Sequence, residues 1–298
     1  MNKYEVARIA LIFGIARDIT LRPIAPSAAF EQELRRIIGK IPASWRRAFR
    51  ELIMPAYKAL KEYLAPRTRT LGVEPPNHHL EKAIAAAAEE TARVVLRSTR
   101  ELDHWTARVE QWTRARMLET LKAGLGKDAG LILFPDDVKH EIAASMQGNI
   151  ALIRDLDRDA RKRLEQIIWQ GVLKNHSVSE IETALSKQLG IVGRRAKLIA
   201  RDQTHKLTAD LVRLRHQQMG IVEYAWHTRE DDRVRGNPYG RYPKARPSHW
   251  AREGTIFRYD QPPEDGNPGE PILCRCVARG VIRLEKEKRR RRFFAEAA

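Results

Sequence analysis

Residues 220–228 read GIVEYAWHT, and the pattern of the chain changes at this point. Large apolar side chains recur at every second position, Val222, Tyr224 and Trp226, which is the period of a β-strand. Upstream of Gly220, apolar residues instead recur every three or four positions, as in helices. We therefore predict an α+β chain, with mostly helical N-terminal two thirds and a small α+β C-terminal module of a few short strands.

Downstream of this strand, proline- and glycine-rich turns separate two further apolar segments. They predict a second strand at Thr255–Tyr259 and a third around Cys274–Ala278. The chain then ends in a basic segment, EKEKRRRRFFAEAA, at residues 285–298.

Upstream, residues 28–64 have a helical pattern that Pro42 and Pro55 should break, because proline lacks a backbone donor and clashes with the preceding turn. Residues 65–79 have the composition of a linker. A long helix is predicted over residues 83–121, which contain neither proline nor glycine. Its apolar stripe is more typical of a core face than of a partner surface, and consists of Leu102, Trp105, Val109 and Trp112.

Three further helical segments precede the strand at residue 221. The first should open at Pro135–Asp137, and its apolar period extends past Asp157 either as one helix or as two. SVSE at residues 177–180 is a capping box, and it predicts a short helix that Gly190 should end. The last helix should run from Arg194 to Gly220.

Composition limits the classes of function. The 298 residues are 43% hydrophobic, and Lys+Arg 55 against Asp+Glu 38 give a formal charge of +17. A strongly cationic chain attracts phosphate, anionic lipid or acidic proteins, and nucleic acid is a common partner. The apolar run Val6–Ile15 is too short to span a membrane, so we expect a buried or partner-docking helix there and no membrane partner. Two cysteines in so long a chain favour a reducing compartment.

The two cysteines, Cys274 and Cys276, are separated by one residue. On a strand their sulfurs would share a face, and a disulfide between them would close a strained ring. The spacing is not that of a CxxC redox pair. Two readings remain: small buried thiols, or a zinc site that needs two more donors. The best donor is His249, followed by Asp231, Asp232 or His227.

The order of short motifs in this region resembles a known family. ARDQTHKL, GIVEYAWHTREDDRVR, RPSHWAREGTIF and PGEPILCRC follow one another at residues 200–276. This is similar to the C-terminal module of the phage Mu F-like minor head proteins, the phage head morphogenesis family. The resemblance covers roughly residues 190–283. Its matching positions are Ala200, Arg201, Thr204, Trp226, Asp232, Val234, Arg235, Ser248, His249, Gly254, Phe257, Pro268, Gly269, Cys274, Arg275 and Cys276.

The sequence departs from the family pattern at two places. The segment 236–245, GNPYGRYPKA, is longer than expected, so the loop before His249 should differ. Gln203 stands where an acidic residue is more typical, which weakens any argument for a catalytic carboxylate on that helix.

The resemblance implies a structural, non-enzymatic role: a minor capsid protein of a tailed bacteriophage, associated with the portal and acting in head assembly and DNA packaging or delivery. It implies the portal protein, the major capsid or scaffolding protein, and non-specifically bound double-stranded DNA as partners. The expected location is the inside of the head near the portal vertex, and the host cytoplasm during assembly. We divide the chain into a portal- or capsid-contact segment (1–70), a long-helix region (71–190), the Mu F-like module (191–284) and a basic tail (285–298).

Two other classes of function stay open. One is a metal-dependent nuclease or a DNA- or protein-modifying enzyme, built on His249, Asp231 or Asp232 and the cysteines. The sequence has no paired-carboxylate, HExxH, P-loop or nucleophile-elbow signature to favour it. The other is a stand-alone DNA-binding module, for which no helix-turn-helix or zinc-finger spacing is found.

The charged residues of the module and the tail allow two further predictions. Arg275 and Arg235 should form ion pairs with Asp232 or Glu270. The tail is either a binding segment for DNA or a neighbouring subunit, or a solvated terminus, and its candidate DNA-binding residues are Lys286, Lys288, Arg289, Arg290, Arg291 and Arg292.

Overall fold

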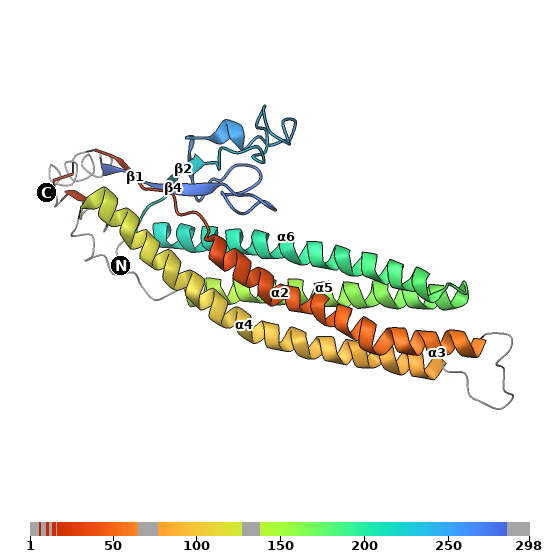
Figure 1. Ribbon diagram of the computed structural model, residues 1–298. Coiled ribbons are helices and arrows are strands. Elements are labelled where there is room, and N and C mark those ends of the chain that lie inside the picture. Colours follow the sequence, from red (N-terminus) through yellow and green to blue (C-terminus); the bar gives the residue numbers. More distant parts are fainter. Residues whose placement is uncertain are drawn as a thin grey trace. The chain divides into compact units, whose positions relative to one another are not determined.

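The computed structural model describes residues 6, 10–11, 14–15, 17–64, 77–126 and 138–284. These residues form two compact units. The helical unit comprises Glu31–Trp105 and Met146–Arg201. The sheet unit comprises the described parts of Met1–Phe30, Thr106–Ser145 and Asp202–Ala298. The helices of both units are labelled in Figure 1.

The N-terminal helices run through both prolines that were expected to break them. Helix α2 (Ala28–Ala48) holds Pro42 at a buried position, and the π-helix η1 (Phe49–Ile53) leads directly into α3 (Met54–Leu64). In the π-turn the Met54 N–H bonds to the Phe49 carbonyl, five residues back, so the turn just before Pro55 is already widened. The predicted breaks were wrong because the wider turn and the buried face keep the chain helical.

Three long helices follow, α4 (Asn77–Leu125), α5 (Lys139–Leu173) and α6 (Val178–Gln218). The predicted core stripe of α4 is confirmed, since Leu102, Trp105 and Val109 are fully buried; its fourth member, Trp112, is partly buried. Helix α4 begins inside the predicted linker, whose first part lies outside the described residues. The expected opening of α5 at residues 135–137 also lies outside them, and α5 continues past Asp157 as one helix.

The capping box at the start of α6 is confirmed. The backbone N–H of Ser177 donates to the Glu180 carboxylate at 2.7 Å, and the Glu180 N–H donates to the Ser177 hydroxyl at 3.3 Å. Gly190 does not end the helix, which continues to Gln218 because its flanking residues Leu189 and Val192 are buried. Gly220, with φ +76°, ends it instead, and the Ile221 N–H bonds back to the His216 carbonyl.

In the helical unit, segments of four helices are joined by core packing and by specific polar bonds. Thr91 of α4 donates to Ser44 of α2 at 3.2 Å, and the Trp45 indole of α2 donates to Asp157 of α5 at 2.8 Å. Arg195 of α6 contacts Asp159 of α5 at 2.6 Å. Polar bonds thus connect α2 with α4 and α5, and α5 with α6.

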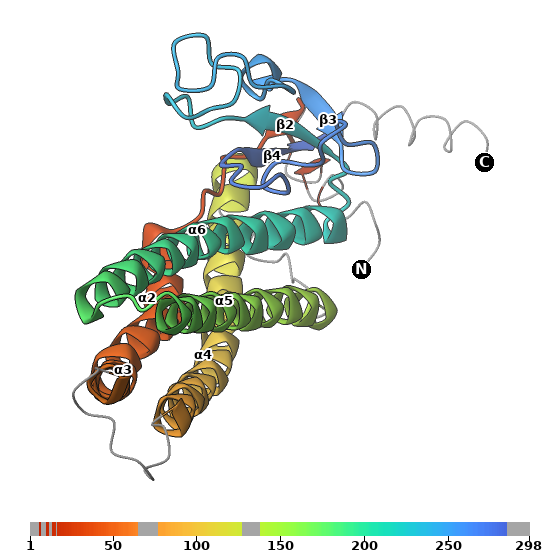
Figure 2. The ribbon, with the colours of Figure 1, turned by 90° about the vertical axis from the view of Figure 1, so that its right-hand side faces the viewer.

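The sheet unit contains a four-stranded antiparallel sheet in the order β1-β4-β2-β3. Its strands are β1 (Ile19–Thr20), β2 (Glu223–His227), β3 (Ile256–Arg258) and β4 (Val277–Ile282). Figure 2 shows β4, β2 and β3 side by side. The first two predicted strands are confirmed. The third begins later than expected, at Val277, so neither cysteine lies on it.

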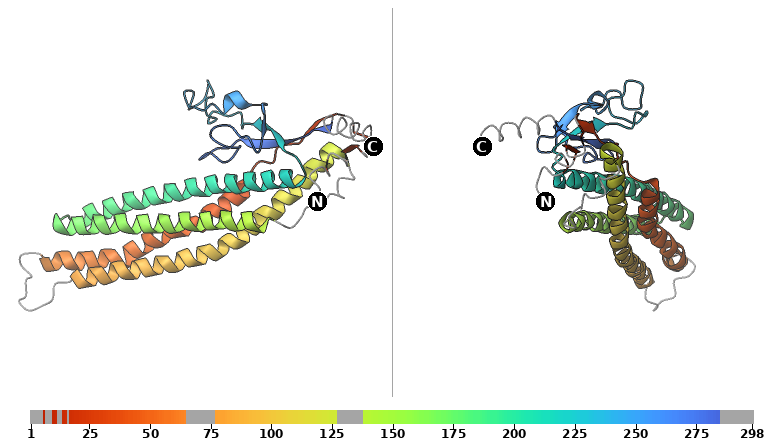
Figure 3. Two further views of the ribbon diagram at one scale, coloured as in Figure 1. Left: turned by 180° about the vertical axis from the view of Figure 1, so that it is seen from behind. Right: turned by 90° about the vertical axis from the view of Figure 1, so that its left-hand side faces the viewer.

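The first strand of the sheet comes from the N-terminal part of the chain, and the sequence did not predict it. Ile19 pairs with Ile282 and Thr20 with Val281, so segments near the two ends of the chain lie side by side (Figure 3). Two apolar clusters stabilise the unit. One packs Leu21 and Ile24 against the ends of α4 and α6, and the other surrounds Tyr224 and Trp226.

The structure contains a mixture of helices and short strands, which confirms the predicted α+β class. No helix in the described ranges combines the length and apolar content needed to cross a bilayer.

Candidate metal centre

Both cysteines lie in the turn that leads into β4. Leu273 adopts a left-handed conformation with φ +58°, and the Cys274 N–H bonds to the Pro271 carbonyl at 2.9 Å. This turn, rather than the alternation of a strand, brings the two thiols to one place. The thiols are each 4% exposed.

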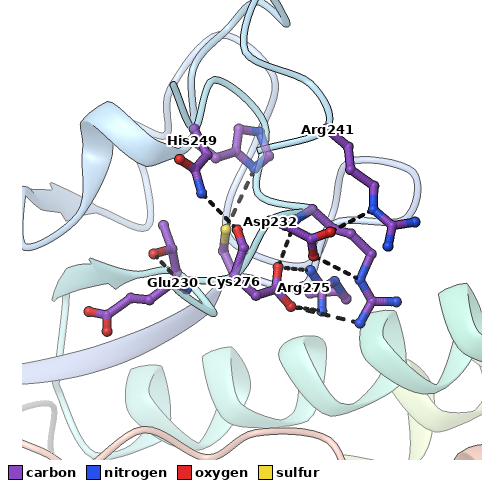
Figure 4. A network of polar contacts seen from close by, with 10 residues as sticks. Glu230, Asp232, Arg241, His249, Arg275 and Cys276 are labelled. Atoms are coloured by element: carbon purple, nitrogen blue, oxygen red, sulfur yellow. Dashed lines mark hydrogen bonds and ion pairs between the residues drawn. The ribbon is translucent and has the colours of Figure 1, made fainter. Parts of the chain in front are cut away.

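His249 approaches the thiols from the segment between β2 and β3. It precedes the 3₁₀ helix η3 (Trp250–Arg252), where the Ser248 hydroxyl accepts a hydrogen bond from the Ala251 N–H at 3.2 Å. The imidazole is 2% exposed, and its Nδ1 lies 3.5 Å from the Cys274 Sγ and 3.6 Å from the Cys276 Sγ. Figure 4 shows the ring facing the Cys276 sulfur. The three donor atoms lie within 4.8 Å of one another.

The other ring nitrogen of His249 is held by a carboxylate. Its Nε2 lies 2.8 Å from Asp265 Oδ2, and Arg252 donates to the second oxygen of Asp265 at 2.5 Å. This bond places the Nε2 proton toward Asp265 and leaves Nδ1 directed at the sulfurs. The indole of Trp226 packs edge-on against the imidazole, with ring centres 5.2 Å apart.

The electrostatics of the cluster shift the pKa values of all three side chains. The Cys276 thiol and then the His249 imidazole and the Gly269 N–H hold the pKa of Cys274 well below its usual range, despite burial. Burial lowers the pKa of His249, but the Cys274 sulfur and Asp265 outweigh it and raise the pKa overall. The pKa of Cys276 is raised by its neighbour Cys274 and by burial. These shifts favour the charged forms of Cys274 and His249 and the neutral form of Cys276.

A Cys–His–Asp series is also the arrangement of a nucleophilic cysteine. Such a nucleophile must reach a substrate, whereas the Cys274 thiol and the His249 ring are both buried. Two sulfurs and one nitrogen directed at one point are instead a set of donors that could hold a metal ion.

Arg275, between the cysteines, points to a different partner from those predicted. Its guanidinium makes two contacts with Asp231, one of them at 2.6 Å, rather than with Asp232 or Glu270. Asp231 is therefore engaged in an ion pair and is not a donor of the His249 cluster. The Arg275 guanidinium lowers the pKa of Asp231, which keeps the pair charged.

The second predicted arginine also has other partners. Arg235 donates to the Ile272 carbonyl at 2.6 Å and lies 3.9 Å from Asp265. Asp232 pairs with Arg241 at 2.6 Å, which ties the loop at 236–245 back to the residues before it (Figure 4). Glu270 accepts from the Asn267 N–H at 2.7 Å. Arg235 and Arg275 were predicted to pair with Asp232 or Glu270, but each has other partners. The spacing of residues along the sequence does not determine which loops of the module come into contact.

His227, the other histidine considered as a ligand, lies in a separate group with Glu230 and Glu253. Its Nδ1 is 2.9 Å from Glu253 Oε1, and the other Glu253 oxygen accepts from the Thr228 N–H at 2.6 Å. Glu230 and Glu253 are exposed, so this group has the character of a surface hydrogen-bond cluster.

Several other motif residues contribute to the surroundings of the cluster. Phe257 packs against Trp226 with ring centres 6.0 Å apart, and the Gly254 N–H bonds to the Trp226 carbonyl at 2.8 Å. Gly269, with φ +93°, lies against α6, where a Cβ would be 2.4 Å from the Ala209 Cβ. Thr204 and Val234 are buried, Pro268 lines a small pocket beside α6, and Ala200 and Arg201 lie on the part of α6 that belongs to the helical unit.

Sequence reasoning missed Asp265 and Arg252, which complete the cluster. A carboxylate partner is a general requirement of a ligand histidine, and that rule was the available signal. The rule did not identify Asp265 in particular, because Glu264 and Glu270 lie in the same loop. The predicted DNA-binding residues 286 and 288–292 lie outside the described residues.

Comparisons with known proteins agree with the motif order. Residues 162–279 match the family model described as Phage Mu protein F like protein, which confirms the resemblance for that part of the chain. An uncharacterized protein of Haemophilus influenzae strain Rd is 31% identical over 181 residues, which are 60% of this chain and 38% of that protein. The chain thus spans well under half of this relative's length. No solved structure matches the chain significantly.

Proposed function

We propose that the chain is a minor head protein of a tailed bacteriophage, placed inside the head at the portal vertex and acting in head assembly and in DNA packaging or delivery. The match of residues 162–279 to the Phage Mu protein F like model carries this proposal. The matched segment includes the His249 cluster and the loops around it, so the similarity covers a folded part of the sheet unit and not isolated motifs.

The charge of the chain supports contact with packaged DNA. A formal charge of +17 favours non-specific, salt-sensitive binding to phosphates, and no base-reading motif accompanies it. The proposed partners are the portal protein, the major capsid or scaffolding protein, and double-stranded DNA. The buried positions of Cys274 and His249 support a structural rather than a catalytic role for the module.

The decisive experiment is quantitative mass spectrometry of purified heads, with the major capsid protein as the internal standard. We expect a few copies of this chain in each DNA-filled head. Its loss from heads that have been emptied would identify delivery with the DNA, and its retention would identify a fixed component of the head. Absence of the chain from both filled and emptied heads would refute the proposal.

The contribution of the basic tail to DNA binding is measured separately with the full chain and with a chain truncated after residue 284. The tail carries Lys286, Lys288 and four consecutive arginines. If all six contact phosphates, the slope of log Kobs against log salt on random-sequence duplex should fall by about 5 on truncation. An unchanged slope would show that the tail is a solvated terminus or contacts protein.

A further inference from the structure

We propose that His249, Cys274 and Cys276 bind a single Zn²⁺ ion, which joins the turn before β4 to the segment between β2 and β3. This inference stands on the geometry of three side chains and does not depend on a role in a phage head.

The distances between the donor atoms fit a tetrahedral zinc ion. With Zn–S about 2.3 Å and Zn–N about 2.0–2.1 Å, tetrahedral angles place a sulfur and a nitrogen about 3.6 Å apart. The His249 Nδ1 lies 3.5 Å from one sulfur and 3.6 Å from the other. One ring nitrogen equidistant from two sulfurs is a poor arrangement for one linear hydrogen bond, but it is the expected arrangement of three ligands around one ion.

The groups that surround the donors have the character of an outer coordination shell. Asp265 holds the distal nitrogen of His249 at 2.8 Å and is itself fixed by Arg252. This carboxylate–histidine relation orients ligand imidazoles in zinc proteins. The Trp226 indole packs edge-on against the His249 ring, with ring centres 5.2 Å apart, and covers the cluster from that side.

Simple packing of two small thiols does not account for this arrangement. A packed core cysteine needs neither a buried imidazole nor a carboxylate and a guanidinium fixed behind it. Both cysteines are free thiols. Two thiolates with one imidazole favour zinc over magnesium or calcium, which take oxygen ligands.

No fourth histidine, cysteine or carboxylate of the described residues joins this group of donor atoms. A tetrahedral ion would then carry water as its fourth ligand. The three protein ligands close a loop of 25 residues between His249 and Cys274 in a unit whose strands are two to six residues long. In so small a sheet, metal binding energy becomes folding energy.

The test is the metal content of the full chain, expressed without a polyhistidine tag and measured by inductively coupled plasma mass spectrometry. We expect about one zinc per chain, and loss of nearly all of it in His249→Ala, Cys274→Ala and Cys276→Ala. The control is His227→Ala, which removes the histidine of the neighbouring surface group and should retain the zinc. Equal zinc in wild type and in all three ligand variants would place the metal elsewhere and overturn the proposal.

A second measurement uses the wild-type chain alone, so it holds even if the ligand variants do not fold. After removal of metal with a chelator, added Co²⁺ should give thiolate-to-metal charge-transfer absorption, and added Zn²⁺ should abolish it and raise the melting temperature. A folded chain that purifies without metal, takes up neither ion and melts at the same temperature with or without zinc would refute the site. Another metal at the same stoichiometry would refute its assignment to zinc.

Discussion

The helical unit and the loops of the sheet unit differ in how many side chains stabilise their conformation. In the helical unit, buried apolar residues recur along every helix and spread the stabilising contacts over long faces, for example Leu34, Ile41, Leu80, Leu102, Leu164 and Leu185. In the sheet unit, strands of two to six residues are connected by long loops that individual polar bonds hold. Asp231 and Asp265 each fix two or more loop groups.

This difference implies different responses to substitution. A distributed core loses a small part of its free energy of unfolding with each surface change, whereas a loop anchored by one side chain loses its conformation. Hydrogen exchange of peptides from each unit reports their stabilities separately, which a single melting curve does not.

The largest expected effect comes from a part-buried ion pair of the sheet unit. The Arg215 guanidinium, 2% exposed, contacts the Glu110 carboxylate, whereas the Arg195–Asp159 pair of the helical unit is exposed. Arg215→Met should destabilise the sheet unit by about 3 kcal/mol, because it leaves the part-buried Glu110 carboxylate without this partner. Arg195→Met, also on α6, should cost less than about 1 kcal/mol in the helical unit. Similar losses of exchange protection for both variants would contradict the comparison.

The next effect separates backbone strain from steric conflict in the loops. Gly269 and Gly254 both have positive φ, but only Gly269 lies against another element, the Ala209 side chain of α6. Gly254→Ala should cost about 1–2 kcal/mol from the left-handed conformation alone. Gly269→Ala adds a Cβ at 2.4 Å from Ala209 and should cost about 2 kcal/mol more. Chemical denaturation of the two purified variants measures the difference, and equal costs would show that the loop moves freely away from α6.

Acid should weaken the sheet unit through His216. Burial lowers the pKa of this imidazole from 6.5 to about 3, and its Nδ1 lies 2.7 Å from the Tyr259 hydroxyl. Between pH 6.5 and 3 the unfolded chain binds a proton that the folded chain does not, so stability falls as the pH falls. The slope contributed by one such group is at most about 1.4 kcal/mol per pH unit. His216→Gln should remove this part of the pH dependence, measured by exchange of sheet-unit peptides.

In the helical unit, Asp157 should change stability with pH in the opposite direction to His216. Burial raises the pKa of Asp157 even though the Trp45 indole donates to it. The folded chain therefore binds its proton at higher pH than the unfolded chain, so this group stabilises the helical unit as the pH falls through the folded pKa toward 3.8, the usual value. Asp157→Asn keeps an acceptor for Trp45 and should remove that gain. An unchanged pH profile of helical-unit peptides in Asp157→Asn would refute the assignment.

Sequence periodicity predicted the helical parts well because their burial repeats over many turns. The stripe of α4 and the capping box at Ser177 needed only local information. The errors occurred where packing overrode a local preference. Gly190 costs a helix about 1 kcal/mol, which the burial of neighbouring Leu189 and Val192 exceeds. Strand β1 has two residues, too few to show any period.

The candidate site was predictable in its donors but not in its support. Cys274, Cys276 and His249 were selected because thiolate and imidazole are the side chains that zinc prefers. Their convergence depends on the turn at Leu273, which no pattern in the sequence predicted. It also depends on Asp265, which is one of three acidic residues in one loop. Arg275 was recognised as an ion-pairing residue, but its partner Asp231 is adjacent to the predicted Asp232. Which of two neighbouring carboxylates faces inward is fixed by loop conformation.

The smallest predicted effect is a gain in stability, and it applies to the helical unit. Gly148 lies on the exposed face of α5, and a Cβ there would meet nothing within 4 Å. Gly148→Ala should stabilise the helix by about 0.5–1 kcal/mol, because alanine loses less backbone entropy than glycine. At Gly171, on the same helix, a Cβ would lie 2.0 Å from the end of the Ile181 side chain.

Gly171→Ala therefore serves as the matched control, since the same gain in helix propensity is offset by displacement of Ile181. Slower amide exchange around residue 148, with no gain around residue 171, would support a distributed helical core in which exposed positions act independently. A loss of stability from Gly148→Ala would show that this face of α5 is covered by another part of the protein. The helical unit would then not tolerate substitution even at an exposed position, and the contrast with the sheet unit would not hold.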